Sequence, residues 1–162
     1  MQIQIAGIVE ESIVDGLGIR MAIFTQGCCH HCPGCHNPNT HDASAGRTDT
    51  TERIIDAMHH NRLIDGITLT GGEPFMQPEA CTRIANAAHE AGLNVWAYTG
   101  YTFEQLLEDD EKSRLLRAVD VLVDGSFLLA QRSLELHFRG SKNQRIIDVP
   151  RSLAEGKVIT IE

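Results

Sequence analysis

Short runs of aliphatic and β-branched residues alternate with amphipathic segments along this chain. This alternation predicts parallel strands that are joined by crossover helices. In the third predicted strand, Trp96 and Tyr98 alternate with Val95 and Ala97, and core packing accounts for all four. The predicted strands are residues 21–25, 66–70, 94–98, 120–124, 144–148 and 157–161.

The amphipathic segments between the strands carry helix-end signals. A capping pair places a side-chain acceptor at the first residue and Glu or Gln three residues later, while Pro opens helices and Gly closes them. The signals in this chain are Asp49 with Glu52, Thr102 with Gln105, and Pro78 with Gly92.

The length limits how many strand–helix units the chain can hold. A closed eight-unit barrel takes about 250 residues, whereas this chain has 162 residues and shows no internal repeat or linker. We therefore expect an α/β fold, a single-domain incomplete (partial) TIM-type barrel with parallel strands and outer helices, that spans residues 1–162. Residues from Gly125 onward are expected to be a short C-terminal elaboration of it.

Composition and charge exclude several classes of protein. The chain carries 14 basic and 22 acidic residues, a formal net charge of −8, which argues against a general nucleic-acid or anionic-membrane surface. No apolar stretch is long enough for a membrane span, and the first ten residues lack a signal-peptide pattern. These observations predict a cytoplasmic protein.

The cysteines point to metal chemistry. Five cysteines, four of them within residues 28–35, are too clustered and too odd in number for a disulfide framework. Cys28, Cys32 and Cys35 follow a predicted strand with C-x3-C-x2-C spacing, which provides three corners of a cubane iron–sulfur cluster. A fully ligated cluster or a structural zinc site needs a fourth ligand. The missing ligand leaves one iron open to an exogenous molecule.

A second motif follows the next predicted strand. Gly71, Gly72, Glu73 and Pro74 come directly after residues 66–70. Ligands gather at the carboxyl ends of parallel strands, so this turn and the cysteines are expected to reach one bound ligand. Paired glycines allow close backbone approach, and a carboxylate is a natural partner for an ammonium group.

These two motifs together resemble the radical S-adenosylmethionine enzymes. The resemblance implies that Cys28, Cys32 and Cys35 hold one 4Fe-4S cluster, whose open iron binds the amino and carboxylate groups of S-adenosylmethionine. Reductive cleavage of the sulfonium then yields methionine and a 5'-deoxyadenosyl radical. The cofactor contacts and metal ligands that the resemblance implies are Gly34, Cys35 and His36 for the adenine, Gly71, Gly72 and Glu73 for the methionine end, and Cys28, Cys32 and Cys35 for the cluster. The family commonly has an aromatic residue where this chain has Gly34.

Further segments are similar to the glycyl-radical-enzyme activases, and within them to the activases of anaerobic, class III ribonucleotide reductase. They are Val14-Asp15-Gly16-Leu17-Gly18-Ile19-Arg20, Cys32-Pro33-Gly34-Cys35-His36-Asn37, Tyr98-Thr99-Gly100-Tyr101, Val123-Asp124-Gly125-Ser126-Phe127 and Arg139-Gly140-Ser141-Lys142-Asn143-Gln144-Arg145. This resemblance implies hydrogen abstraction from a glycine of the reductase, with flavodoxin or ferredoxin as the electron donor. It also implies that Asp15 joins the three cysteines at the catalytic site and hydrogen-bonds the incoming peptide backbone.

Other interpretations stay open at this point. The partner is alternatively another glycyl radical enzyme such as pyruvate formate-lyase, or the substrate is a small molecule, as for 7-carboxy-7-deazaguanine synthase. A zinc-binding interaction module would use the cysteines with nearby histidines such as His30 and His41. Cys29 is interpreted as a neighbour of the cluster, and Cys81 as a core residue at helical spacing. Residues 139–145 either dock an acidic partner or form a solvated loop, and Asp15 is alternatively a simple turn residue.

Overall fold

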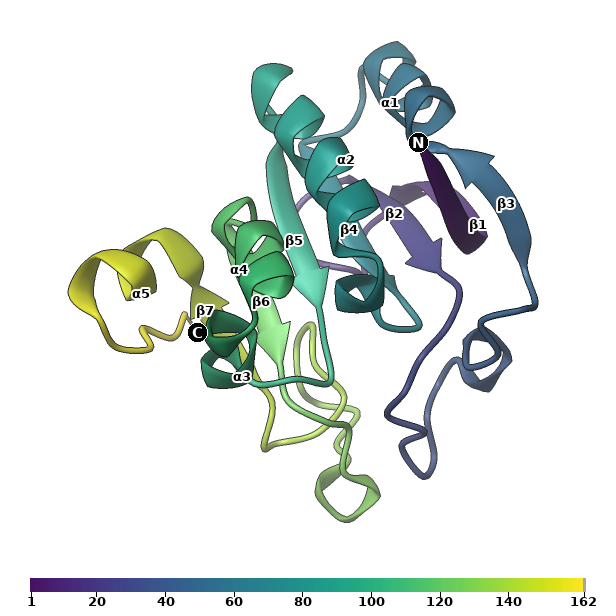
Figure 1. Cartoon of the computed structure of the whole chain (residues 1–162). Helices are drawn as coiled ribbons and strands as arrows, with labels where there is room; N and C mark the ends of the chain where they lie inside the picture. The colour runs from purple at the N-terminus through teal and green to yellow at the C-terminus, as the bar shows by residue number, and fades with distance from the viewer. Residues whose placement is uncertain (162) are drawn as a thin grey trace.

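A computed structural model describes residues 1–161 of the chain as a seven-stranded sheet with helices packed on one face (Figure 1). The sheet order is β3-β1-β2-β4-β5-β6-β7. The strands are β1 (Gln2–Ser12), β2 (Arg20–Thr25), β3 (Arg47–Thr50), β4 (Gly66–Gly71), β5 (Asn94–Tyr98), β6 (Val121–Asp124) and β7 (Arg145–Asp148). The α-helices are α1 (Thr51–His60), α2 (Pro78–Glu90), α3 (Phe103–Glu108), α4 (Asp110–Arg117) and α5 (Val149–Glu155). Three short 3-10 helices are η1 (Pro38–Thr40), η2 (Pro74–Met76) and η3 (Leu129–Gln131).

The sheet is parallel at its centre and antiparallel at both edges. β2, β4, β5 and β6 run parallel, whereas β1, β3 and β7 pair with their neighbours in antiparallel fashion. The prediction of an α/β fold with parallel strands is therefore confirmed for the centre and wrong for the edges. The sheet is open, with β3 and β7 as its edge strands, and this strand order does not establish a barrel.

Most predicted strands are present, and the exceptions have physical reasons. Residues 157–161 form no strand in the described chain and contribute one isolated bridge, from Thr160 to Ile147. β1 and β3 were not predicted. All four side chains of β3 are polar, so this strand has no hydrophobic pattern from which it could be predicted. It is an edge strand that pairs with β1.

Two of the three predicted helix-end signals are confirmed. Thr102 and Gln105 form the expected capping box of α3, and Pro78 opens α2, after which Gly92 takes a left-handed φ of 77°. The prediction of an Asp49 cap is wrong by one residue. Thr50 Oγ1 accepts the hydrogen bond from Arg53 N–H at the start of α1, while the Asp49 carboxylate accepts from Thr50 N–H.

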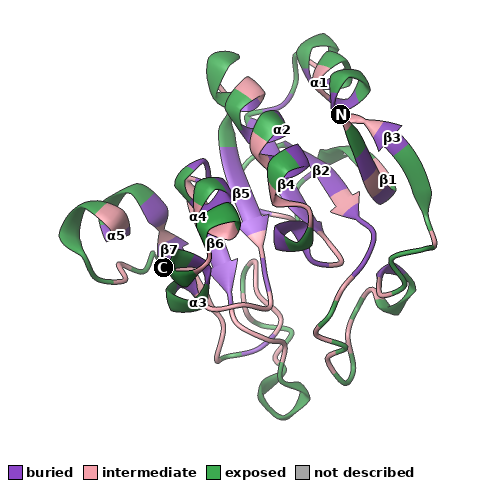
Figure 2. Ribbon diagram, viewed as in Figure 1, coloured by how far each residue is buried: buried purple, intermediate pink, exposed green. Residues whose placement is uncertain are grey.

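The two faces of the sheet bury different side chains. Met21, Ile23, Ile67, Leu69 and Val95 belong to the core that the helices cover. The alternate residues of the same strands, among them Arg20, Thr68 and Trp96, are also buried but lie outside that core. Figure 2 shows β5 and β6 as buried strands between the helices and the long loops. Among residues 1–161, no helix combines the length and apolar character needed to cross a membrane.

Candidate metal centre

The carboxyl ends of the parallel strands meet at one pocket. β2 and β4 run in register from Arg20 opposite Gly66 to Thr25 opposite Gly71, so the segments that follow them start side by side. The three motif cysteines and the paired glycines line this pocket, together with residues at the end of β5 and after β6. The lining residues are Cys28, His30, Cys32, Cys35, Thr40, His41, Thr70, Gly71, Gly72, Tyr98, Thr99, Gly100, Gly125, Phe127 and Gln144. The expected meeting of the two motifs is confirmed.

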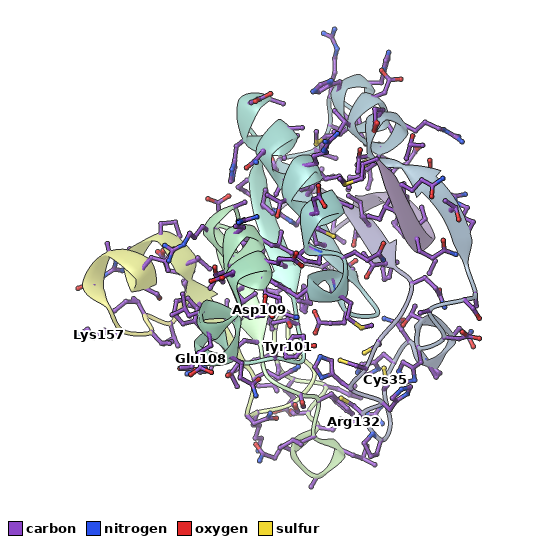
Figure 3. The ribbon with its side chains drawn as sticks, in the orientation of Figure 1. Cys35, Tyr101, Glu108, Asp109, Arg132 and Lys157 are labelled. Carbon is purple, nitrogen blue, oxygen red and sulfur yellow. The ribbon has the colours of Figure 1, made fainter. Side chains whose placement is uncertain are left out.

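The cysteine loop is closed at its base by backbone hydrogen bonds. Gly27 N–H donates to Thr40 O at 2.7 Å, and Cys28 N–H donates to His41 O at 3.1 Å. Within the loop, Cys35 N–H donates to Cys32 O at 3.1 Å, which forms a tight turn around Gly34 with its left-handed φ of 75°. The loop thus directs Cys28, Cys32 and Cys35 into one pocket (Figure 3 labels Cys35).

The other two cysteines lie in different environments. Cys29 is exposed, and its sulfur lies 3.3 Å from the hydroxyl of Tyr101, which Figure 3 shows on the same side of the molecule as Cys35. Cys81 is fully buried in the helix-covered core, where burial raises the pKa of its thiol to about 12. Neither lines the pocket. This separation agrees with the interpretation of Cys29 as a neighbour and Cys81 as a core residue.

Backbone amides donate hydrogen bonds to the sulfurs of Cys28 and Cys35. Burial raises the pKa of the Cys28 thiol, while hydrogen bonds from the backbone of His30 and His31 oppose that rise. Asn37 N–H donates to the Cys35 sulfur at 3.4 Å. Hydrogen bonds to cluster sulfurs are one of the ways in which proteins set the potential of an iron–sulfur cluster. The donor set of three thiols with amide contacts therefore fits such a cluster.

The spacing of the side chains also bears on the choice of metal. Within residues 1–161, no three His, Cys, Asp or Glu side chains come close enough to hold a single metal ion. A zinc site gathers its ligands around one ion, whereas each cysteine of a cubane cluster binds a different iron. In such a cluster Cys28, Cys32 and Cys35, which line the same pocket, would each bind a separate iron.

The glycine turn is held against the start of the cysteine loop. Gly72 N–H donates to Thr25 O at 2.9 Å, and Glu73 N–H donates to Gly27 O at 2.8 Å. Gly71 has a φ of 100°, and a Cβ at Gly72 would lie 2.3 Å from Gly27 O. Both positions thus require glycine because the turn lies against the chain's own backbone. The result is a fixed distance between the two motifs.

Glu73 connects the motifs from behind the pocket. Its carboxylate is fully buried and accepts hydrogen bonds from His30 Nε2 at 2.7 Å, Thr99 Oγ1 at 2.7 Å and Gly100 N–H at 2.8 Å. A fourth bond comes from Phe75 N–H at 3.0 Å. Glu73 is not among the residues that line the pocket. In this structure it orders the cysteine loop and the end of β5, and direct contact with a cofactor ammonium group stays a prediction.

Several residues of the pocket were not singled out from the sequence. Tyr98 was interpreted as a core residue, but its side chain reaches the pocket because it lies on the sheet face opposite the helices. Phe127 also lines the pocket and lies against His36, with ring centroids 5.2 Å apart. Both residues belong to segments that carry the family resemblance, but only the sheet order brings them to the cysteines.

Asp15 does not line the pocket. It is half-buried, and Ser12 Oγ donates to its carboxylate at 2.6 Å, which is the turn geometry that the alternative interpretation expects. Its carbonyl oxygen accepts a hydrogen bond from Thr68 Oγ1 at 2.6 Å. The segment of Asp15 is thereby attached to β4.

The basic segment at residues 139–145 is largely committed to internal contacts. Arg145 forms ion pairs with Asp124 at 2.6 Å and Glu104 at 2.8 Å, and Arg139 Nη1 donates to Gln144 O at 2.7 Å. Arg145 lowers the pKa of Glu104 through these hydrogen bonds. Two of the three cations therefore stabilise the loop itself.

Comparison with known proteins agrees with this site. A family described as a 4Fe-4S single cluster domain matches residues 14–147, which include both motifs. An anaerobic ribonucleoside-triphosphate reductase-activating protein from Vibrio cholerae is 36% identical over 143 residues, which cover 83% of this chain and 90% of that protein. The chain belongs to this family of activating proteins. Members from Enterobacteria phage T4 and Escherichia coli are 35% and 33% identical, each over 82% of this chain, and over 86% and 90% of their own lengths. The resemblance drawn from the motifs is confirmed.

Proposed function

We propose that this protein activates an anaerobic ribonucleotide reductase by reductive cleavage of S-adenosylmethionine at one 4Fe-4S cluster. The observation that carries the proposal is the single pocket that holds three cysteines and the paired-glycine turn. Its relatives are named as activating proteins of that reductase. We treat residues 1–162 as one radical S-adenosylmethionine domain, whose open sheet is the counterpart of an incomplete barrel.

Cys28, Cys32 and Cys35 are the residues that would hold three of the four irons. When bound, the cluster supplies one electron that breaks the sulfonium C5'–S bond, giving methionine and a 5'-deoxyadenosyl radical that takes a hydrogen atom from the partner's glycine. The electron comes from an external donor of the flavodoxin or ferredoxin class. Backbone amides next to Cys28 and Cys35 would donate hydrogen bonds to the sulfurs that hold the cluster.

The pocket offers separate surfaces to the two ends of the cofactor. Gly71 and Gly72 present backbone groups close to the cysteine loop, which suits the methionine end. Phe127, with His36 beside it, offers an aromatic contact for the adenine near Gly34 and Cys35. Glu73 connects the glycine turn to the cysteine loop through His30 and to the end of β5 through Gly100.

An exposed apolar surface supports a protein as the substrate. Ile13, Val14 and Leu17 are about 70% exposed in the segment before β2, and Leu134 is 85% exposed in the loop before β7. Leu129, in that same loop, lies at the cysteine turn, since a Cβ at Gly34 would be 2.8 Å from its side chain. Leu129 is 51% exposed, so an apolar side chain is available to a protein partner beside the cysteine turn. A partner that covers them also excludes water from the radical.

Anaerobic reconstitution tests the proposal directly. The protein, supplied with iron, sulfide, reductant and S-adenosylmethionine, is mixed with an anaerobic ribonucleotide reductase, and electron paramagnetic resonance is used to detect the glycine-centred radical. Pyruvate formate-lyase serves as the matched glycyl radical control. A signal on the reductase alone supports the proposal. Cofactor cleavage without a signal on the reductase would contradict it and favour a different substrate.

A further inference from the structure

The segment between β1 and β2 crosses the sheet face opposite the helices. Gly16 has a φ of 125°, and a Cβ there would lie 2.8 Å from the Trp96 ring and 2.9 Å from Arg20 Cδ. The backbone of this segment therefore lies directly on two side chains of β5 and β2. Leu17 and Asp15, its neighbours, are fixed by contacts with the same face.

Arg20 is a buried cation without an acidic partner in the described part of the chain. Its side chain is 0% exposed, and no carboxylate of residues 1–161 forms an ion pair with it. Instead its guanidinium donates to Thr68 Oγ1 at 2.8 Å, Leu17 O at 2.8 Å and Ile67 O at 2.7 Å. Burial lowers its pKa to about 10, so it remains charged at neutral pH. Such a desolvated cation is retained only where its hydrogen bonds are well made.

The Thr68 hydroxyl has one possible orientation in this network. Arg20 Nε can only donate, so the hydroxyl oxygen accepts from it and the hydroxyl proton points to Asp15 O, 2.6 Å away. Thr68 is fully buried on β4, where it joins the charge of Arg20 to the backbone of Asp15. Hydrogen bonds in such a chain polarise one another.

The Asp15–Leu17 segment contacts β4 and β5 at Thr68 and Trp96, which lie opposite each other in the sheet. Two residues further along the same faces of these strands, Thr70 and Tyr98 line the candidate pocket. A peptide that reaches the pocket from the open face of the sheet would therefore pass the Asp15 segment.

We propose that Thr68 is a positioning residue for the partner peptide: with Arg20 it fixes the Asp15–Leu17 backbone on the sheet and so sets how the glycine segment is presented to the pocket. This inference rests on the proposed function. It assigns Thr68 no contact with the cofactor. Loss of the Thr68 hydroxyl is therefore expected to impair activation of the reductase and to leave cofactor cleavage unchanged.

The test compares Thr68→Val with Thr68→Ser in the reconstituted holoprotein. Valine keeps the shape but removes both hydrogen bonds, while serine keeps the hydroxyl. We expect Thr68→Val to raise the reductase concentration for half-maximal glycyl-radical yield on the order of tenfold, since one buried hydrogen-bond pair is lost. Thr68→Ser is expected to stay within about twofold of wild type. Thr82→Val is the matched control, because that hydroxyl donates only to Pro78 O within α2.

Reductase-independent formation of 5'-deoxyadenosine and iron content are measured on the same samples. Both are expected to stay near wild type in Thr68→Val, which a general folding defect would not allow. An unchanged half-saturating reductase concentration overturns the inference, as does a parallel fall in cofactor cleavage that serine does not rescue. If the wild-type protein gives no glycine-centred signal on the reductase, the proposed function fails first and this inference with it. If the wild-type protein gives the glycine-centred signal and Thr68→Val needs no more reductase than wild type, the inference fails and the proposed function stands.

Discussion

On β4, Ile67 and Leu69 face the helices, while Thr68 and Thr70 face the opposite side of the sheet. The first pair joins an aliphatic core, whereas Thr68 carries hydrogen bonds to Arg20 and Asp15, and Thr70 lines the candidate pocket. All four are buried to a similar degree. Burial alone therefore does not separate residues that hold the fold from residues that prepare the site, but the face on which they lie does.

Removal of a pocket cysteine is expected to have the largest effect on the candidate site. Cys28→Ala, Cys32→Ala or Cys35→Ala should abolish cluster binding and cofactor cleavage, because each thiolate is proposed to hold one iron. Iron content, visible absorption and 5'-deoxyadenosine formation under anaerobic conditions measure this. Cys81→Ala is the matched control, since Cys81 packs in the helix-covered core. A Cys81 variant that loses its cluster while Cys28→Ala keeps it would reverse the ligand assignment.

The helix-covered face should respond through stability. Ile67→Ala removes a fully buried side chain and is expected to lower the free energy of unfolding by about 2–5 kcal/mol. Thermal unfolding of the reconstituted protein measures the loss, and cluster content per folded molecule should not change. Leu63→Ala, at a 66% exposed position, is the control with little expected effect. An Ile67 variant with normal stability but impaired cofactor cleavage would break the division between the two faces.

Glu73 is fully buried like the core residues, but it accepts hydrogen bonds from His30 and Gly100 next to the candidate pocket. Its replacement therefore tests stability and the site together. Glu73→Gln keeps the shape but turns an NH₂ group toward existing N–H or O–H donors, which is expected to destabilise the protein by about 1–3 kcal/mol. Faster loss of iron to a chelator should accompany the lower stability, because the hydrogen bond from His30 loses its charged acceptor. Glu79→Gln, at an exposed position of α2, is the control. Normal stability with only a raised KM for S-adenosylmethionine would instead show direct cofactor contact by Glu73.

The smallest effect is expected at the Glu104–Arg145 pair on the sheet edge. Arg145 lowers the pKa of Glu104 in the folded state, so this stabilisation is present above the unfolded pKa and is lost as the pH falls through the lower folded value. Since Glu104 is exposed, Glu104→Gln should cost less than about 1 kcal/mol at neutral pH. Thermal unfolding at neutral and acid pH measures this. A difference from wild type that persists at low pH would contradict the electrostatic origin.

The sequence predicted the elements whose signals are local or whose strands are buried on both sides. The capping box of Thr102 and Gln105 lies within four residues, and β4 is a continuous run that both faces of the sheet cover. The edge strand β3 was missed because its four polar residues gain their order only from pairing with β1. The prediction of a C-terminal strand at residues 157–161 was wrong. After α5 this segment turns back to β7 and, within residues 1–161, forms one isolated bridge there, from Thr160 to Ile147.

By itself, the sequence determined the chemistry available to this protein: the cysteine spacing, the paired glycines and the strands that place both at strand ends. The tertiary structure decided which other side chains share that chemistry. Tyr98, Phe127 and His30 join the pocket through sheet order and loop packing, and Thr68 meets Asp15 across 53 positions of the chain. Spacing within a motif is a short-range property of the backbone, whereas these contacts depend on which strands lie side by side. That arrangement is fixed only when the whole sheet buries its core.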